Sequence, residues 1–335
     1  MRPLRRSRRT TTNTTSRESK SVPDKYNEAF AVLDEVTHPG EGKKCEIHMY
    51  ERRFNSRGEP IFLQSGSRSE LGFFVTRSIE AALVLTKYYS IKNELDITQL
   101  EIKSPHIREA LKKVVQSYPG VNINSSGPIL IPGDPMCLFH YRDELQNYAS
   151  KVQNIEAKEH VIFLLQYMTK ALRKEIVSYE ELMENNDVPP GLEFENLWMA
   201  FKPGTLLYEN DKGSDIICRL RDVRRVRPYM APPHWSIDTE MIYHDGKNFR
   251  FVPRVREIKK FDGYRPLTEF EIFPLEYHEN QKTLRTKLRE RGKQYIKYLG
   301  HHHCMYEGIA ELNAFYGRGT QAMVSCLTNT LHTTY

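Results

Sequence analysis

The sequence contains one run of metal-binding residue types, His301-His302-His303-Cys304. Imidazole nitrogen and thiolate sulfur bind zinc, and a structural zinc site needs four such ligands, usually from two spaced pairs. In an extended chain successive side chains point to opposite faces, so His301 and His303 separate from His302 and Cys304. The sequence shows no second pair at a suitable spacing. We therefore expect a polar turn after Gly300 and no metal site.

A predicted helix between Asn280 and Tyr298 carries a dense set of cations, which are Lys282, Arg285, Lys287, Arg289, Arg291, Lys293 and Lys297. Such a helix can bind an anionic partner, either nucleic acid or an acidic protein face. Arg285, Arg289 and Lys293 are the candidate anion contacts. The alternative is the solvated side of an amphipathic helix, whose apolar stripe includes Leu284 and Leu288.

A second basic run extends from Arg219 to Arg227. As a strand it would place Arg219, Arg221, Arg225 and Arg227 on one face. Guanidinium groups arranged in this way can clamp phosphates. They can equally pair with Asp and Glu on neighbouring strands, and we expect this pairing.

No catalytic or nucleotide-binding motif is found in the sequence. It has no GxxxxGK[ST] phosphate loop, HExxH, GxSxG or EF-hand loop, and Gly317-Arg318-Gly319 lacks the third glycine of a dinucleotide fingerprint. We therefore expect no catalytic residue and no cofactor in this chain. An enzyme whose site is assembled from scattered residues remains an alternative.

The composition limits the class of protein to which the chain can belong. The chain has 335 residues, of which 39% are apolar and 27% charged, as in globular proteins. Its five cysteines form no CxxC pair, which indicates reduced, intracellular thiols. The longest apolar run, within His160–Met168, is too short to span a membrane, and the N-terminus lacks a secretory h-region.

Much of the net charge of +6 comes from the first residues of the chain. Residues 1–25 are predicted to be a disordered basic tail, because they cannot bury enough apolar surface to offset their ordering entropy. The cluster Arg5–Arg9 leaves three roles open: a nuclear-localisation signal, a mitochondrial transit peptide or a solvated tail. We expect an intracellular protein of the nucleus or cytoplasm, with the mitochondrion as the alternative.

An N-terminal α+β region is predicted over residues 26–153. Lys44–Phe54 and Pro60–Leu63 resemble a hairpin, and Ile97–Ile102 is a further candidate element. Glu80–Tyr89 fits a helix or a strand. Ser104-Pro105 is a typical helix start, with the serine as N-cap, for a helix from His106 to Gln116.

After this helix, Val121–Phe139 is predicted to be a loop that contains a short buried strand at Ile129–Ile131, and Tyr141–Val152 is predicted to be helical. A helical connector follows at residues 154–190. Its apolar residues, spaced by three and four, predict one long helix from Glu156 to Glu184, which Pro189-Pro190-Gly191 ends.

A β-rich domain is predicted over residues 191–311, followed by an irregular tail, 312–335. Its candidate strands are Leu206–Tyr208, Ile216–Val226, Trp235–Tyr243 and Asn248–Ile258. Short strands with close turns favour a small antiparallel barrel or sandwich, here closed by the basic helix. The predicted fold class is thus α+β, with Trp198, Phe201 and Tyr208 as core aromatics at the entry to this domain.

Several short motifs in this domain resemble one family. They are Leu197–Gly204 with Trp198, Phe201, Pro203 and Gly204; Phe273–His278 with Phe273, Pro274, Leu275, Tyr277 and His278; Arg289–Lys293 with Arg291 and Gly292; and Tyr306–Ala310 with Tyr306 and Gly308. In order and spacing they resemble the uncharacterised domain that precedes the AAA+ ATPase core in many filamentous-fungal ATPases. Ile102–Pro105, Tyr118–Gly120 and Leu138–Leu145 resemble the region upstream of it.

This resemblance implies a non-catalytic accessory module for recruiting substrates or partners, with a protein or an AAA+ core as its partner. Full-length relatives are expected to be ATPases, so ATP and magnesium are expected as cofactors only if an ATPase core is attached. The chain departs from the family by stopping at Tyr335, and we expect a fragment, a truncated product or a free-standing paralogue. The alternative function is weak, sequence-independent nucleic-acid binding through the basic tail and basic helix.

Overall fold

The computed structural model describes residues 40–65, 78–185, 187–211, 213–244, 248–297, 306–312 and 320–326, the last two as backbone only. Contacts between Cα atoms divide the chain into Met1–Pro39 and Gly40–Tyr335, and every described residue lies in the second unit. The predicted tail at residues 1–25 and the run from His301 to Cys304 therefore lie outside the described residues.

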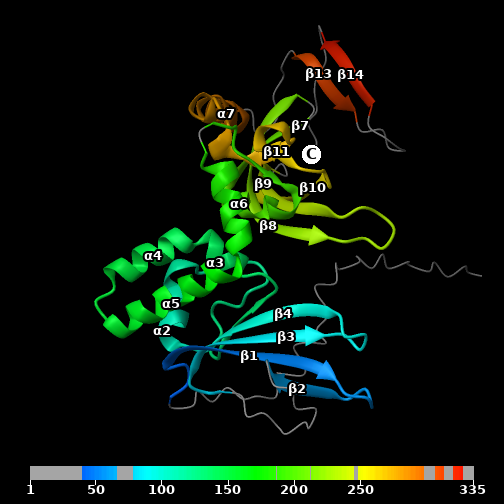
Figure 1. The fold of residues 1–335 in the computed structure, drawn as a ribbon. Helices are drawn as coiled ribbons and strands as arrows, with labels where there is room; N and C mark the ends of the chain where they lie inside the picture. Colours follow the sequence, from blue (N-terminus) through cyan, green and yellow to red (C-terminus); the bar gives the residue numbers. More distant parts are fainter. Residues whose placement is uncertain are drawn as a thin grey trace, which may run out of the picture. The chain divides into compact units, whose positions relative to one another are not determined.

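The first half of the described chain builds a five-stranded mixed sheet in the order β2-β1-β3-β4-β5 (Figure 1). Its strands are β1 (Lys44–Phe54), β2 (Pro60–Gln64), β3 (Ala81–Tyr89), β4 (Leu95–Ile102) and β5 (Ile129–Pro132). The predicted β1–β2 hairpin is confirmed, and β1 also pairs in parallel with β3. β3 is buried along most of its length, which explains its near-continuous apolar sequence.

Helices α2 (Pro105–Val114), α3 (Met136–His140), α4 (Arg142–Lys151), α5 (Ile155–Ala171) and α6 (Arg173–Met183) follow. The predicted start of α2 is confirmed, because the Ser104 side chain caps the helix by accepting a hydrogen bond from the Ile107 amide. The predicted loop from Val121 to Phe139 contains β5, as expected, and also the short helix α3, which was not predicted.

The prediction of one helix from Glu156 to Glu184 is wrong, because Leu172 separates α5 from α6. Leu172 has φ −106° and ψ 27°, outside the helical region, and its side chain is buried in the core. The Leu172 amide donates to the Met168 carbonyl, and the Leu172 carbonyl accepts from the Ile176 amide, so backbone hydrogen bonds continue on either side of the break. The apolar spacing of three and four continues across such a break, so periodicity alone does not reveal it.

The second half contains β6 (Gly191–Glu193), the 3-10 helix η1 (Phe194–Ala200) and a five-stranded antiparallel sheet in the order β10-β9-β8-β7-β12. The strands of this sheet are β7 (Leu206–Asp211), β8 (Ser214–Val226), β9 (His234–His244), β10 (Phe249–Lys259) and β12 (Ile272–Pro274). Fold class α+β is confirmed. Within the described residues the sheet is open, with β10 and β12 at its edges, so the barrel alternative is not found.

The two faces of this sheet are chemically different. Register places Trp235, Ile237 and Thr239 of β9 on the inner, buried face, and Asp238 and Glu240 on the outer face. Successive strand residues point to opposite faces, so the face of each residue of β8 or β10 that pairs with β9 follows from its partner.

A bulge in β8 overturns the predicted row of four arginines. The register shifts between Leu220 and Asp222, so Asp222 lies opposite Asp238 on the outer face, and Arg225 lies opposite Trp235 on the inner face. An extra residue in one strand changes which side chains share a face. Arg225 accordingly binds Glu195 of η1, with 2.8 Å between a guanidinium nitrogen and a carboxylate oxygen, whereas Arg219 stays on the outer face.

The remaining elements include β11 (Tyr264–Pro266), which pairs with β6, the 3-10 helices η2 (Leu267–Glu269) and η3 (Leu275–Tyr277), and helix α7 (Gln281–Lys297). β13 (Tyr306–Leu312) and β14 (Thr320–Cys326) form an antiparallel hairpin. The predicted irregular tail at 312–335 therefore contains a strand. Its backbone hydrogen bonds are made with β13, a pairing that the pattern of one segment does not show.

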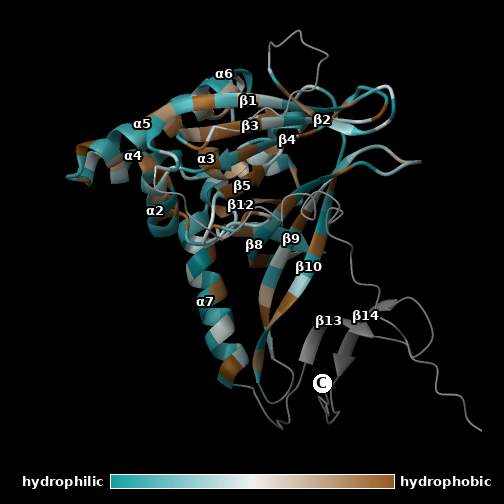
Figure 2. Ribbon diagram, turned by 90° about the horizontal axis from the view of Figure 1, so that it is seen from below, coloured by the Kyte–Doolittle hydropathy of each residue, from teal (hydrophilic) through white to brown (hydrophobic). Residues whose placement is uncertain are grey.

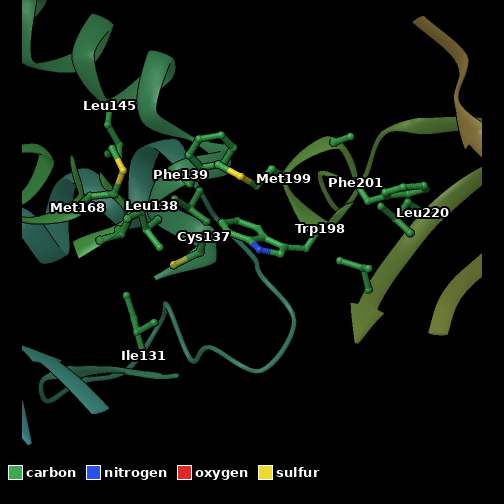
Figure 3. Packing of buried hydrophobic residues seen from close by; sticks show 14 of the residues in the cluster. Ile131, Cys137, Leu138, Phe139, Leu145, Met168, Trp198, Met199, Phe201 and Leu220 are labelled. Atoms are coloured by element: carbon green, nitrogen blue, oxygen red, sulfur yellow. The ribbon is translucent and has the colours of Figure 1, made fainter. Parts of the chain in front are cut away.

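One large buried cluster extends from Ala82 to Phe273 and includes residues on both sides of residue 190. Trp198 is 3% exposed, which confirms it as a core residue and excludes it as an exposed base-stacking platform. Figure 3 shows Trp198 between Cys137 and Phe139 on one side and Phe201 on the other. The predicted domain boundaries stay a prediction, since the core is continuous across them.

Candidate interaction surface

An exposed row of apolar side chains lies on the outer face of β9 and β10. We call it the apolar strip, and it consists of Ile242, Phe249, Phe251, Pro253 and Val255. Ile242, Phe251 and Val255 are 62%, 58% and 56% exposed. Phe251 lies directly opposite Ile242, so these two side chains are neighbours on the same face.

Charged side chains border the strip on β8 and β9. Glu240 lies opposite both Pro253 and Arg219. Arg219 donates a 2.6 Å hydrogen bond to Glu240, and its guanidinium carbon lies 4.9 Å from the centre of the Phe251 ring. The expected pairing of arginines with neighbouring strands is thus confirmed for Arg219. An apolar centre with a charged rim is typical of a protein–protein interface.

A cleft of about 540 Å³ opens on the same outer face. It is lined by Ser117, Tyr118, Pro119, Tyr141, Pro203, Gly204, Arg221, Asp222 and Asp238. Asp238 belongs to the cleft and lies directly opposite Val255 of the apolar strip. The cleft and the strip therefore adjoin on the outer face of the sheet.

Several local features bring the lining of the cleft together. The bulge in β8 places Asp222 opposite Asp238. Gly204 has φ +91°, a conformation that side chains rarely adopt, in the turn that leads into β7. Its amide donates to the Leu220 carbonyl, which ties this turn to β8 beside the bulge. Tyr141 joins α3 to α4, and Ser117–Pro119 follow α2.

The two carboxylates of the cleft already have partners. Arg224 lies 3.0 Å from Asp222 and also forms an ion pair with Asp238, while Ser236 donates a 2.8 Å hydrogen bond to Asp238. Burial raises the pKa of Asp222, although nearby Arg224 opposes this effect. An ionised carboxylate has about four acceptor sites, so the cleft can still accept hydrogen-bond donors or a cationic side chain from a partner.

A buried hydrogen-bond chain supports the wall of the cleft. The Tyr118 hydroxyl lies 2.9 Å from Nδ1 of His140, and Nε2 of His140 lies 2.9 Å from the Trp198 carbonyl oxygen. A carbonyl only accepts, so Nε2–H donates to it, and Nδ1 accepts from the tyrosine. Burial lowers the pKa of His140 to about 4, against the opposing effect of the Trp198 carbonyl. His140 is therefore neutral at pH 7.

The buried, neutral His140 in this hydrogen-bond chain predicts that the stability of the fold decreases at acidic pH. The pKa of His140 rises from about 4 in the fold to about 6.5 when unfolded, so the unfolded state binds more protons and stability falls as pH decreases through this window. Between pH 7 and pH 5 we expect the free energy of unfolding to decrease by about 2 kcal/mol through this residue. Urea unfolding at both pH values, compared with His140→Gln, measures it. An equal decrease in the variant would contradict the assignment.

A buried Ser–His pair is the nearest match to catalytic geometry. The Ser104 hydroxyl lies 2.8 Å from Nδ1 of His160, whose Nε2 lies 3.2 Å from the Lys43 carbonyl. Ser104 is 0% exposed, and its oxygen also caps α2. Neither Ser104 nor His160 lines the cleft. A nucleophile must reach its substrate, so this buried pair gives no support to an enzyme. It connects the residue before β1, the N-cap of α2 and α5.

Most family-motif residues lie in the core or at its margin. Trp198, Phe201, Phe273, Pro274 and Leu275 are buried. Pro203, Tyr277 and His278 are half-buried, whereas Gly204, Arg291 and Gly292 are exposed. Tyr306 and Gly308 lie in β13, opposite Cys326 and Val324. Pro203 and Gly204 of this set line the cleft, and so do Tyr118, Pro119 and Tyr141 of the upstream motifs.

The candidate anion contacts Arg285, Arg289 and Lys293 are exposed on α7. None of them lines the cleft. Among the described residues no group of three or more metal-binding side chains is found. Cys137 and Cys218 are buried, and burial raises the pKa of Cys218 to about 11, which disfavours its thiolate.

Sequence patterns did not identify Asp222, Asp238 or the apolar strip as a site. Alternation of apolar residues along Phe249–Val255, with Arg254 and Arg256 on the other face, predicts that the apolar face is buried, whereas the structure exposes it. The bulge that pairs Asp222 with Asp238 left no recognisable signal in the sequence.

The fold and this surface define an α+β protein with a candidate interaction face. Residues 184–279 match the model of a family described as domain of unknown function (DUF7025). The matched segment includes η1, β7 to β10 and the whole apolar strip. The expectation of an uncharacterised domain is thereby confirmed. Searches of curated proteins and of solved structures found no match.

Within the part of the chain that the structure describes, no helix is long and apolar enough to cross a membrane. The longest helices, α5 and α7, have 17 residues each, and both carry charged side chains.

Proposed function

We propose that this chain is a non-catalytic interaction module that binds a partner protein through the apolar strip and the adjoining cleft. The observation that carries the proposal is the exposure of Ile242, Phe249, Phe251 and Val255 together on one face. Contiguous exposed apolar residues with a polar rim are typical of protein-binding surfaces.

The composition of the surface supports a partner protein. Arg219 stacks on Phe251, and Arg and Phe are residue types enriched at interfaces. The cleft beside Val255 offers Tyr141 and Asp238 to a side chain of the partner. Burial of the strip would provide affinity, and the charged groups around it would provide orientation.

The resemblance described above suggests the identity of the partner. The motifs resemble the domain that precedes the AAA+ core in filamentous-fungal ATPases, and the uncharacterised-domain match covers two of those motifs, Leu197–Gly204 and Phe273–His278. We propose that the chain is an accessory module of this kind, which contacts an AAA+ core or recruits its substrates. In this role the chain itself binds no ATP or magnesium.

The proposal predicts direct binding that depends on the strip. We expect the wild-type chain to bind a purified AAA+ core of the resembling fungal ATPases. Phe251→Asp should weaken this binding at least tenfold, about 1.4 kcal/mol, because it places a charge in the centre of the interface. Isothermal titration calorimetry measures both constants.

Ile155→Asp is the matched control, since Ile155 is 74% exposed on α5 and lies outside the strip. It should bind like the wild type. Equal affinities for the Phe251 variant and the wild type would contradict a role for the strip. Absence of binding by the wild type would contradict the AAA+ partner.

A further inference from the structure

We infer that the outward face of α7 binds the phosphate backbone of duplex nucleic acid, in addition to the proposed protein contact. The face consists of Lys282, Arg285, Arg289 and Lys293, which we call the basic stripe. Their spacing of three, four and four residues places them along one side of the helix. At about 1.5 Å per residue the stripe is about 16 Å long.

Contacts on the side of α7 opposite the basic stripe fix the orientation of the helix. Leu284 is 5% exposed and packs into the fold. Lys287 lies 2.9 Å from the Asp215 carboxylate, and Arg291 donates a 2.8 Å hydrogen bond to the Asp215 carbonyl. Leu284, Lys287 and Arg291 share one side of the helix, again by spacing of three and four. The basic stripe therefore points away from the sheet.

The stripe carries charge that the described part of the chain does not neutralise. Lys282, Arg285 and Arg289 are exposed and form no ion pair with a described residue, and Lys293 is paired only with Glu290, 2.8 Å away on the same helix. By contrast, Arg219, Arg224 and Arg225 of β8 are paired with carboxylates. Hydrophilic colours dominate α7 in Figure 2, with hydrophobic residues between them.

The chemistry of the stripe favours a nucleic-acid duplex over other anionic partners. A duplex presents one charge per about 1.7 Å along its axis, which suits a straight row of cations. A membrane-surface helix buries a continuous apolar side in lipid, but Leu284 of α7 is already covered by the fold and Ile296 is the one aliphatic residue of α7 that is exposed. Stacking on single-stranded bases needs aromatic side chains, and Tyr295, the aromatic residue of α7, follows Arg291 by four residues and so lies on the side opposite the stripe.

The test is a fluorescence-anisotropy titration of the full chain with a labelled duplex of about 30 base pairs, long enough to cover the stripe several times. The four phosphate contacts of the stripe are expected to contribute about −3.6 to the slope of log affinity against log salt, which corresponds to a loss of affinity of about a hundredfold between 50 and 200 mM salt. The triple variant Lys282→Glu, Arg285→Glu, Arg289→Glu should make the slope of log affinity against log salt less negative by about 2.7, and it should lower the affinity at least tenfold.

The control is Lys158→Glu, Lys170→Glu, Lys174→Glu, which makes the same change in net charge on exposed positions of α5 and α6. It should retain most of the affinity. Equal losses in both variants would show a net-charge effect and overturn the inference. Preference for single strands, for phosphatidylserine vesicles or for polyglutamate over the duplex would also overturn it. Phe251→Asp should leave duplex binding unchanged, so this result is independent of the proposed protein interface.

Discussion

Replacing Trp198 by alanine is expected to lower the free energy of unfolding by about 3–5 kcal/mol. The side chain is 3% exposed and packs edge-on against Phe139, with 5.4 Å between ring centres, and against His140 at 5.6 Å. Truncation removes this buried area and leaves a cavity that close-packed neighbours fill only in part. Urea unfolding followed by circular dichroism gives the midpoint and the free energy.

Tyr229→Ala is the control for this measurement, because Tyr229 is an aromatic residue that is fully exposed. Its unfolding midpoint should match the wild type. Trp198 lies where η1 meets α3, so its loss should weaken both the helical part and the β-rich part of the fold. If Trp198→Ala leaves the midpoint unchanged, the position of this residue in the shared core is wrong.

Glu209→Gln is expected to cost about 3 kcal/mol, the second large effect. Glu209 is 1% exposed on the inner face of β7, and Nε of Arg256 donates a 2.6 Å hydrogen bond to it. Arg254 lies 3.6 Å from Glu209 and 2.6 Å from Asp211. These arginines belong to β10, so the network joins β10 to β7 across two intervening strands.

The physical reason for the cost is that the amide removes the buried carboxylate that Arg254 and Arg256 share, so the partly exposed Asp211 becomes the carboxylate nearest to both. Breaking a buried pair by removing one partner leaves an uncompensated charge. Glu257→Gln is the control, since its side chain is 58% exposed and lies 3.8 Å from His234, and it should cost about 0.5 kcal/mol or less. In a double-mutant cycle with Arg256→Gln, additive effects would contradict the coupling between β7 and β10.

The sequence alone predicted the elements whose signals lie within a few neighbouring residues. Ser104-Pro105 begins α2 because a serine hydroxyl can cap the helix and proline fits its first turn. The strands β7 to β10 follow from alternating and β-branched residues between turn signals. The burial of Trp198 and the pairing of Arg219 with a neighbouring strand were also predicted, because large aromatics are seldom exposed and charges on adjacent strands attract.

The candidate surface was decided by the tertiary structure. A bulge placed Asp222 opposite Asp238 and turned Arg225 to the inner face, and strand periodicity cannot indicate an extra residue. Likewise, the break at Leu172 keeps the apolar spacing of a continuous helix, so only its packing reveals it.

The cleft combines Tyr118 with Asp222, residues far apart in the chain. The same holds for the pairing of Glu209 with Arg256 across the sheet. A local pattern states which residues prefer burial, but not which distant residues meet or which apolar row stays exposed. Those outcomes depend on the summed packing of both halves of the chain around one core, which only the folded structure contains.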